Sequence, residues 1–125
     1  MEISRVRDLL RDVEGLSGIW FGVLRMDYSR EWAACLFAKR AEPKLVVGGD
    51  EATGFDVSAY SLMLRLGRDA IESKRLAGMI FEGVRRVVVD GGFIRPFYGA
   101  AVCLGADKNG VFEYQVDFEV FQKRV

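Results

Sequence analysis

The sequence contains no histidine, and this one absence excludes several kinds of chemistry. Histidine is the usual general base near neutral pH and a frequent metal ligand, so Ser-His-Asp and Cys-His catalysis and most zinc or iron sites are excluded. Carboxylate or lysine catalysis stays open. Its acidic candidates, Asp56, Glu82 and Asp90, lack the spacing of a catalytic pair, and we interpret them as ordinary surface or turn residues.

Cysteine and long apolar runs are also scarce. Cys35 and Cys103 lie in separate apolar stretches without a CxxC pair, which predicts two buried free thiols. The charged, amphipathic start of the chain differs from the continuous apolar segment of a signal peptide, which indicates a protein made and kept in the cytoplasm. Since no stretch approaches the roughly 20 apolar residues needed to cross a bilayer, we expect no membrane partner.

Loops typical of phosphate or calcium sites are missing as well. The glycine pairs at residues 48–49 and 91–92 lack the lysine and the helix signature of a phosphate-binding loop. Residues 107–110 resemble the opening of a calcium loop, but the next ligand positions are not filled. The sequence therefore predicts no catalytic residue, no cofactor and no metal ion.

What is present is enough for one folded domain. The chain has 125 residues, 50% of them hydrophobic, and its 18 basic residues balance 18 acidic ones. This length supports one core, so we expect a single domain over residues 1–125. The even charge predicts no face that grips DNA or a membrane surface.

Apolar residues near the N-terminus recur at three- and four-residue spacing, which predicts an amphipathic helix that ends near Gly15. They are Ile3, Val6, Leu9, Leu10 and Val13. Residues 19–24 and 32–38 are short apolar runs between turn signals. We expect them to form two strands of a hairpin.

Residues 39–54 form the longest predicted loop, because Pro43 and several glycines among charged residues break the strand pattern. A loop of about 15 residues in a small domain is often functional. One interpretation is an interface with a neighbouring subunit, for which the candidate residues are Lys44, Asp50 and Glu51. The other is a flexible excursion without such a role.

The middle of the chain predicts a central strand followed by a long helix. Residues 55–66 carry largely apolar side chains on both faces, which is typical of a central strand. Asp69 stands three residues before Glu72, the spacing of a helix cap. The apolar stripe that follows predicts a helix that covers the sheet and ends before residues 90–92. Its members are Ile71, Leu76, Ala77, Ile80, Phe81, Val84 and Val88.

The last third predicts a second hairpin, over residues 98–121. We expect residues 93–104 to form the fourth strand, with Pro96 near its start, where a missing amide hydrogen does least damage. Asn109 and Gly110 supply the positive φ angles of a tight turn before the last strand.

The strand after this turn alternates almost without a break. Its apolar side chains point one way, and Glu113, Gln115, Asp117 and Glu119 point the other. Alternate residues lie roughly 7 Å apart, so the acidic side chains diverge instead of converging on an ion. They form either a solvated face or a surface that meets a partner.

The predicted order of elements is α-β-β-β-α-β-β. Hairpins at both ends and one long covering helix favour an antiparallel or mixed sheet of about five strands over a doubly wound parallel sheet. The predicted fold class is therefore α+β, with an N-terminal helix in addition to the covering helix.

The C-terminal hairpin carries a resemblance to a known family. Its pattern GxDxNGVFEY at residues 105–114, followed by xVxFxVF, resembles the C-terminal hairpin of the minor capsid or tail-terminator (tail completion) proteins of long-tailed bacteriophages. The N-terminal helix before residues 19–22 is similar to that family's layout. So is the strand at residues 62–65, which continues through residues 67–69 into a helix.

The resemblance implies a virion protein without enzymatic activity, made in the bacterial host cytoplasm. It would form a ring, usually a hexamer, that caps the head-proximal end of the tail tube and joins it to the head connector. Its partners would be copies of itself, the tail tube protein and the head–tail connector protein, and subunits could stay monomeric until they meet a tail end. DNA would pass through without specific binding, and Glu113, Asp117 and Glu119 would face the lumen or a neighbouring subunit.

Two other functional classes stay open. A standalone ligand-binding or regulatory α+β domain without catalytic activity predicts a monomer or dimer with a closed apolar pocket. A histidine-free hydrolase or transferase needs acidic or basic side chains that converge in a cleft, and no sequence pattern indicates one.

Overall fold

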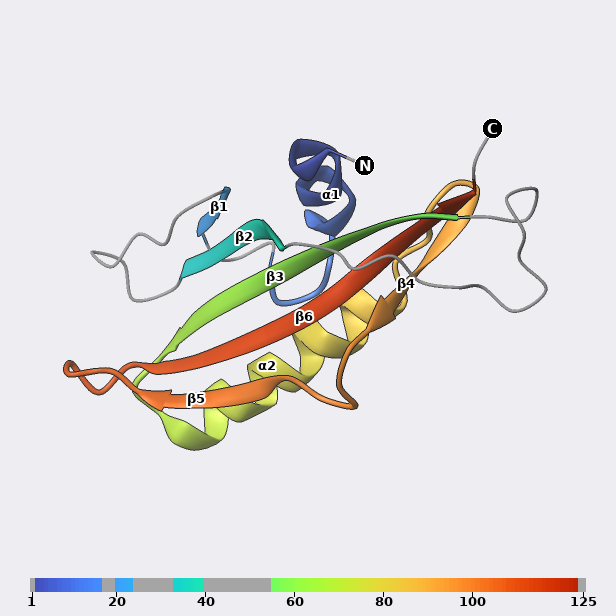
Figure 1. Cartoon of the computed structure of the whole chain (residues 1–125). Coiled ribbons are helices and arrows are strands. Elements are labelled where there is room, and N and C mark those ends of the chain that lie inside the picture. Colours follow the sequence, from blue (N-terminus) through green and yellow to red (C-terminus); the bar gives the residue numbers. More distant parts are fainter. Residues whose placement is uncertain (1, 17–19, 24–32, 40–54, 124–125) are drawn as a thin grey trace.

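A computed structural model describes residues 2–16, 20–23, 33–39 and 55–123 (Figure 1). Within these residues the elements in chain order are α1 (Ile3–Leu10), β1 (Trp20–Val23), β2 (Ala33–Lys39), β3 (Phe55–Gly67), α2 (Ala70–Arg85), β4 (Gly92–Pro96), β5 (Val102–Ala106) and β6 (Phe112–Lys123). The α+β class is confirmed. One more strand is present than predicted, because residues 93–104 contribute to two strands and not one.

The strands form one mixed sheet in the order β1-β2-β3-β6-β4, and β5 also pairs with β6. β3 pairs with one side of β6 along nearly its whole length. β4 and β5 both pair with the other side of β6, β5 with its first half and β4 with its second half. β1 and β2 pair in parallel, and the other pairs are antiparallel. The predicted hairpin of the first two strands is therefore wrong, because a tight turn cannot join parallel neighbours. The residues between them lie outside the described part of the chain.

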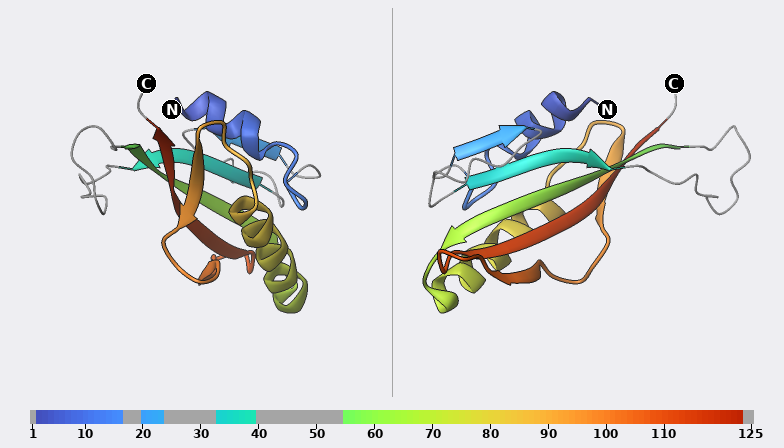
Figure 2. Two further views of the ribbon diagram at one scale, coloured as in Figure 1. Left: turned by 90° about the vertical axis from the view of Figure 1, so that its right-hand side faces the viewer. Right: turned by 60° about the vertical axis from the view of Figure 1, so that its left-hand side comes forward.

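Both helices contribute to one core on one face of the sheet (Figure 2). The core residues of the sheet alternate along β2, β3 and β6, as the pleat of a strand requires. The most deeply buried side chains of this core include Leu36, Tyr60, Leu62, Leu64, Ile80 and Phe118. We call this the helix face, and the opposite side of the sheet the open face.

α2 begins where the sequence predicts it. The carboxylate of Asp69 accepts a hydrogen bond from the Glu72 amide at 2.9 Å, which satisfies one of the free amides at the helix start. The helix ends at Arg85, several residues earlier than predicted. Ile71 and Val88, which we placed in the apolar stripe, are 84% and 85% exposed, so the buried stripe is shorter than predicted.

α1 is also shorter than predicted, and turns follow it up to Leu16. Val6 and Leu10 on the helix and Val13 after it are buried in the core, as predicted. Gly15 has φ +96°, and a Cβ atom at this position would lie 2.7 Å from the Ile80 side chain of α2. The turn after α1 thus passes directly against α2, which brings both helices into the same layer.

β3 is a central strand, as predicted, and several of its side chains are buried on both faces. On the open face Cys35 is buried, so its predicted environment is confirmed. Cys103 on β5 is exposed, and the prediction of two buried thiols is wrong for this residue. None of the helices among the described residues is both long and apolar enough to span a membrane.

Candidate interaction surface

The clearest functional feature is the edge of the sheet formed by β4, residues 97–101 and β5, which we call the outer edge. Five of its large apolar side chains are between 37% and 57% exposed. They are Phe93, Phe97, Tyr98, Val102 and Leu104. Apolar residues of this size normally find cover inside a domain, so a concentration of them on one short stretch indicates an interaction surface.

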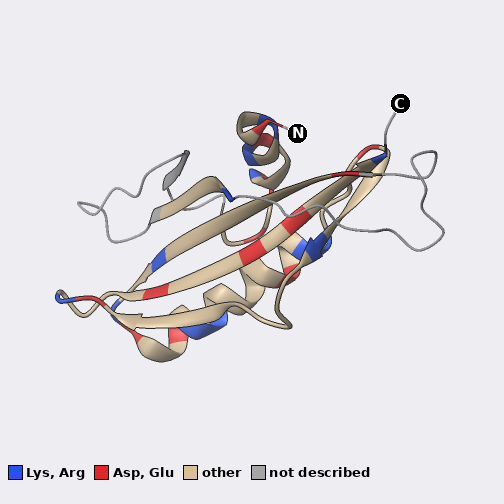
Figure 3. Cartoon of the chain, viewed as in Figure 1, with Lys and Arg blue, Asp and Glu red and all other residues tan. Residues whose placement is uncertain are grey.

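The outer edge exposes these residues because nothing in the described chain pairs with its far side. β5 pairs with β6 along one side and is at the margin of the sheet, and its residues from Val102 to Leu104 are all exposed. Residues 96–106 contain no charged residue, and Figure 3 shows this stretch free of blue and red. Soluble proteins usually protect such an edge with charged side chains, but residues 96–106 have none, and Arg95 near the end of β4 is the one charged residue of the outer edge.

The outer edge is interrupted between β4 and β5. Pro96 pairs with Phe118, and Val102 pairs with Gln115, so five residues on the edge span a stretch that two residues span on β6. The surplus residues leave the ladder and carry Phe97 and Tyr98 outward. The prediction of one continuous strand over residues 93–104 is therefore wrong, and Pro96 ends a strand instead of standing near the start of one.

The turn between β5 and β6 is fixed by Asp107. Its carbonyl accepts a hydrogen bond from the Gly110 amide at 3.0 Å, and Gly110 has φ +79°. Its carboxylate accepts bonds from the amides of Asn109 and Val111 at 2.8 and 3.0 Å and from Arg65 of β3 at 3.1 Å. The predicted hairpin is confirmed.

These contacts shift the acidity of Asp107. The hydrogen bond from the Val111 amide lowers the pKa of the Asp107 carboxyl, partial burial opposes this, and the Asn109 amide and the Arg65 guanidinium lower the pKa further. The carboxyl pKa therefore lies below its ordinary value. The buried Arg65 side chain thus ties the turn at the end of β5 to the central strand β3.

A second polar group, which we call the Asp117 cluster, lies on the open face beside the interruption of the outer edge. Oδ2 of Asp117 lies 2.8 Å from Nζ of Lys39 at the end of β2. Oδ1 accepts hydrogen bonds from Oγ of Ser61 at 2.6 Å and from Nε2 of Gln115 at 2.8 Å. Burial of the Asp117 carboxyl raises its pKa, but the bonds from Lys39, Ser61 and Gln115 and the charge of Lys39 outweigh burial, so the pKa is lowered.

The acidic row of β6 differs from the solvated face that its alternation suggested. Asp117 and Glu119 are 6% and 2% exposed, and Glu113, opposite Arg65 in the ladder, is partly exposed. Asp117 is therefore an internal ion-pair partner in the folded chain. The candidate loop residues Lys44, Asp50 and Glu51 lie outside the described residues, so the structure does not place them.

The described residues form no metal centre and leave two open hollows. No three of their Cys, Asp and Glu side chains come together as metal ligands do. A hollow of about 510 Å³ lies between the start of α1, the last residues of β2 and the first half of β3. A second hollow, of about 310 Å³, lies between α1 and the residues Asp90 and Gln122. Both are open to solvent, unlike the closed apolar pocket that a ligand-binding domain predicts.

The three acidic residues considered as catalytic candidates do not come together. Asp56 and Asp90 are exposed, and Glu82 pairs with Arg85 on α2 at 2.8 Å. The outer edge, by contrast, was missed by the sequence reasoning. Two features of residues 96–106 could have indicated it: large apolar residues at both odd and even positions, and the absence of any charged residue.

A comparison with protein-family models finds no match. A comparison with curated protein sequences also finds no match. The function of the chain is therefore inferred from the geometry of the outer edge and from the resemblance of the C-terminal hairpin.

Proposed function

We propose that this protein is a structural assembly subunit whose copies associate through the outer edge. The observation that carries the proposal is the exposure of large apolar side chains on a sheet edge whose far side no described strand pairs with and whose one charged residue is Arg95. Three half-exposed aromatic rings alone leave on the order of 300 Å² of apolar surface in solvent. Exposed apolar area of that order is comparable with the largest single patches on typical monomers, which are often interfaces.

A second copy of the chain is the partner that fits this edge best. The uncharged stretch of this edge, residues 96–106, can lie beside the same stretch of a second copy without bringing like charges together. The chain has 18 basic and 18 acidic residues, so no net charge drives the copies apart. Strand edges provide unpaired amides and carbonyls, which add direction to the apolar contact.

We propose further that the assembly is the ring that ends the tail tube of a long-tailed bacteriophage, with the tail tube protein and the head–tail connector protein as its other partners. The resemblance of residues 105–121 supports this assignment. A ring through which DNA slides needs interfaces and no reactive group, and in it Glu113 is the member of the acidic row that stays partly exposed toward the lumen or a neighbour.

The test of the interface is a charge placed on the outer edge. Leu104→Lys puts an ammonium group where a neighbouring strand would pack, and burying an unpaired charge costs roughly 2 kcal/mol or more. We expect self-association at least about 30-fold weaker than in the unchanged protein. It is measured by sedimentation velocity over a concentration series, alone and with purified tail tubes.

Ile71→Lys is the matched control, because Ile71 is an equally apolar and more exposed residue on α2. This variant should associate like the unchanged protein. Equal association of both variants would overturn the assignment of the interface. An unchanged protein that stays monomeric at high concentration and leaves tube ends unoccupied in electron micrographs would overturn the assembly function.

The standalone ligand-binding domain is the competing class, and two observations separate it from the assembly subunit. It predicts a concentration-independent monomer or dimer whose thermal stability rises with a small molecule. The second observation is the identity of the neighbouring genes. Head-closure and tail-tube genes beside the coding sequence support the assembly subunit, and metabolic genes support the ligand-binding domain.

A further inference from the structure

The interruption of the outer edge lies beside the Asp117 cluster, and the two are joined by several contacts. The Phe97 amide donates a hydrogen bond to the backbone carbonyl of Asp117 at 3.0 Å. This bond follows the last ladder pair of β4, just where residues 97–101 leave the sheet. The backbone of Asp117 thus sets where the outward loop begins.

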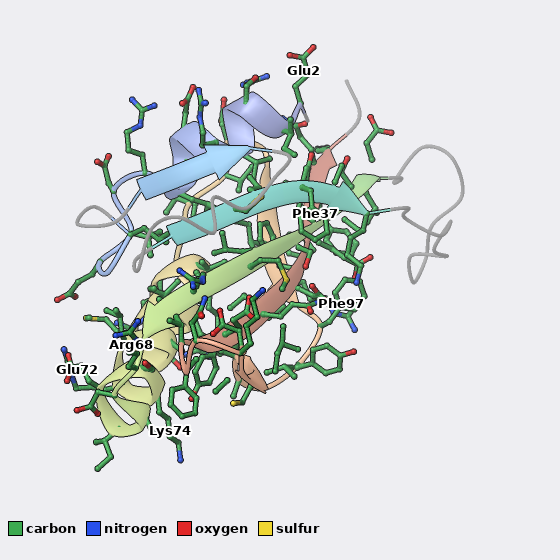
Figure 4. The ribbon with its side chains drawn as sticks, turned by 90° about the vertical axis from the view of Figure 1, so that its left-hand side faces the viewer. Glu2, Phe37, Arg68, Glu72, Lys74 and Phe97 are labelled. Carbon is green, nitrogen blue, oxygen red and sulfur yellow. The ribbon has the colours of Figure 1, made fainter. Side chains whose placement is uncertain are left out.

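The side chain of Asp117 acts on the same loop through Lys39. Nζ of Lys39 lies 2.8 Å from Asp117 Oδ2 and 5.8 Å from the centre of the Phe97 ring. A cation at this distance from a ring is attracted by its electron-rich face. Lys39 therefore connects β2, β6 and the loop, and Figure 4 shows the side chains of this region with Phe97 labelled beside β6.

We infer that Lys39 and Asp117 are positioning residues that hold Phe97 and Tyr98 as a docking point for a second copy of this chain. The inference rests on the proposed function, because it assigns a purpose to the same outer edge. Phe97 is 45% exposed and Tyr98 is 57% exposed, so both keep surface for a neighbour while Phe97 is held from behind. Aromatic residues fixed in advance are the usual anchors of interfaces, since little rotational freedom is lost on binding.

The arrangement has the burial expected of a positioning device. Asp117 and its donor Ser61 are almost inaccessible to solvent, so the carboxylate is fixed on the sheet. The Lys39 side chain is 39% exposed, and without its partner it can turn into solvent at little cost to the fold. Loss of the pair should therefore release the loop more than it weakens the core.

The first test is hydrogen exchange of the monomer, which does not depend on assembly. In Lys39→Met and Asp117→Asn, we expect exchange at the Phe97 amide, which donates to the Asp117 carbonyl, to accelerate about tenfold, because a local opening needs one contact fewer. Amides of α2 should exchange as before in Lys39→Met, which leaves the Asp117 carboxylate its bonds from Ser61 and Gln115. Lys39→Arg keeps a cation over the ring and should restore slow exchange, whereas Arg75→Met on the exposed side of α2 is the control for loss of a surface ion pair.

The second test is association of the same variants by sedimentation velocity. Lys39→Met should weaken it roughly tenfold and Lys39→Arg should not, since the gain from fixing an anchor is of that order. Unchanged exchange at the Phe97 amide in both Lys39→Met and Asp117→Asn would overturn the inference, even if the chain assembles. Unchanged association of the double variant Phe97→Ala/Tyr98→Ala would instead overturn the proposed interface. The exchange result would still show whether Lys39 and Asp117 hold Phe97 in place. If Asp117→Asn does not fold, the exchange and association of Lys39→Met alone test the inference.

Discussion

The helix face and the outer edge of this sheet contain the same kinds of residues and use them in opposite ways. Leu62 and Leu64 on the helix face are completely buried under α1 and α2. Leu104 and Val102 on the outer edge are 49% and 37% exposed. The difference teaches that residue type does not separate core from interface in this chain. What separates them is whether the described part of the chain supplies a covering element.

The most direct way to break this comparison is to truncate one leucine on each side. Leu62→Ala removes a completely buried side chain, and we expect it to lower the free energy of unfolding by about 3 kcal/mol or more, because a cavity remains. Leu104→Ala should change it by less than about 0.5 kcal/mol in the monomer. Urea unfolding at low protein concentration measures both values. A similar loss in the two variants would show that Leu104 belongs to the core.

Acid unfolding sharpens the comparison for charged groups on the open face. The folded-state pKa values of Asp117 and Asp107 lie below their ordinary values, for the reasons given above. A carboxylate whose pKa is lower folded than unfolded stabilises the fold above the unfolded value, about 4. That stabilisation is lost as pH falls through the folded-state pKa.

We therefore expect the unfolding free energy to fall as the pH drops below the unfolded value of about 4 and through the lower folded-state pKa values. Asp117→Asn removes one source of this dependence, so its stability should vary less with pH, and its stability at pH 7 should be lower by about 2 kcal/mol. Chemical unfolding at a series of pH values provides the measurement. Asp12→Asn, in the exposed turn after α1, is the control, and an equal change of slope in both variants would contradict the role of Asp117.

The two cysteines give the smallest and simplest comparison. Burial raises the pKa of the Cys35 thiol and removes it from solvent, whereas Cys103 lies exposed on β5. The thiolate is the reactive form, so a thiol reagent at pH 7.5 should label Cys103 roughly two orders of magnitude faster than Cys35. Both should react quickly in urea. Labelling of Cys103 should also slow on assembly, and unslowed labelling in an assembled sample would place the interface elsewhere.

The features that the sequence predicted correctly are governed by neighbours along the chain. The cap of α2 needs Asp69 and an amide three residues later, and the β5–β6 turn needs Asp107 and a residue able to adopt positive φ at Gly110. The central position of β3 follows from apolar side chains on both of its faces. Each of these is a short-range pattern, and a single sequence is sufficient to read it.

The features that were predicted wrongly depend on which element lies alongside. Alternation tells where side chains point but gives no strand direction, so the parallel pairing of β1 and β2 could not be distinguished from a hairpin. The split of residues 93–104 depends on the register of β4 and β5 along β6. The burial of Asp117 depends on Lys39, which lies 78 positions earlier in the chain.

By itself, the sequence determined the α+β class, the position of the capped helix and the C-terminal hairpin, because local hydrogen bonds and the period of apolar residues produce them. The tertiary structure alone decided which apolar side chains stay uncovered and which carboxylates become internal. Those outcomes depend on contacts between strands that are distant in the chain, and pairing along β6 is what leaves Phe97 and Tyr98 exposed at the outer edge.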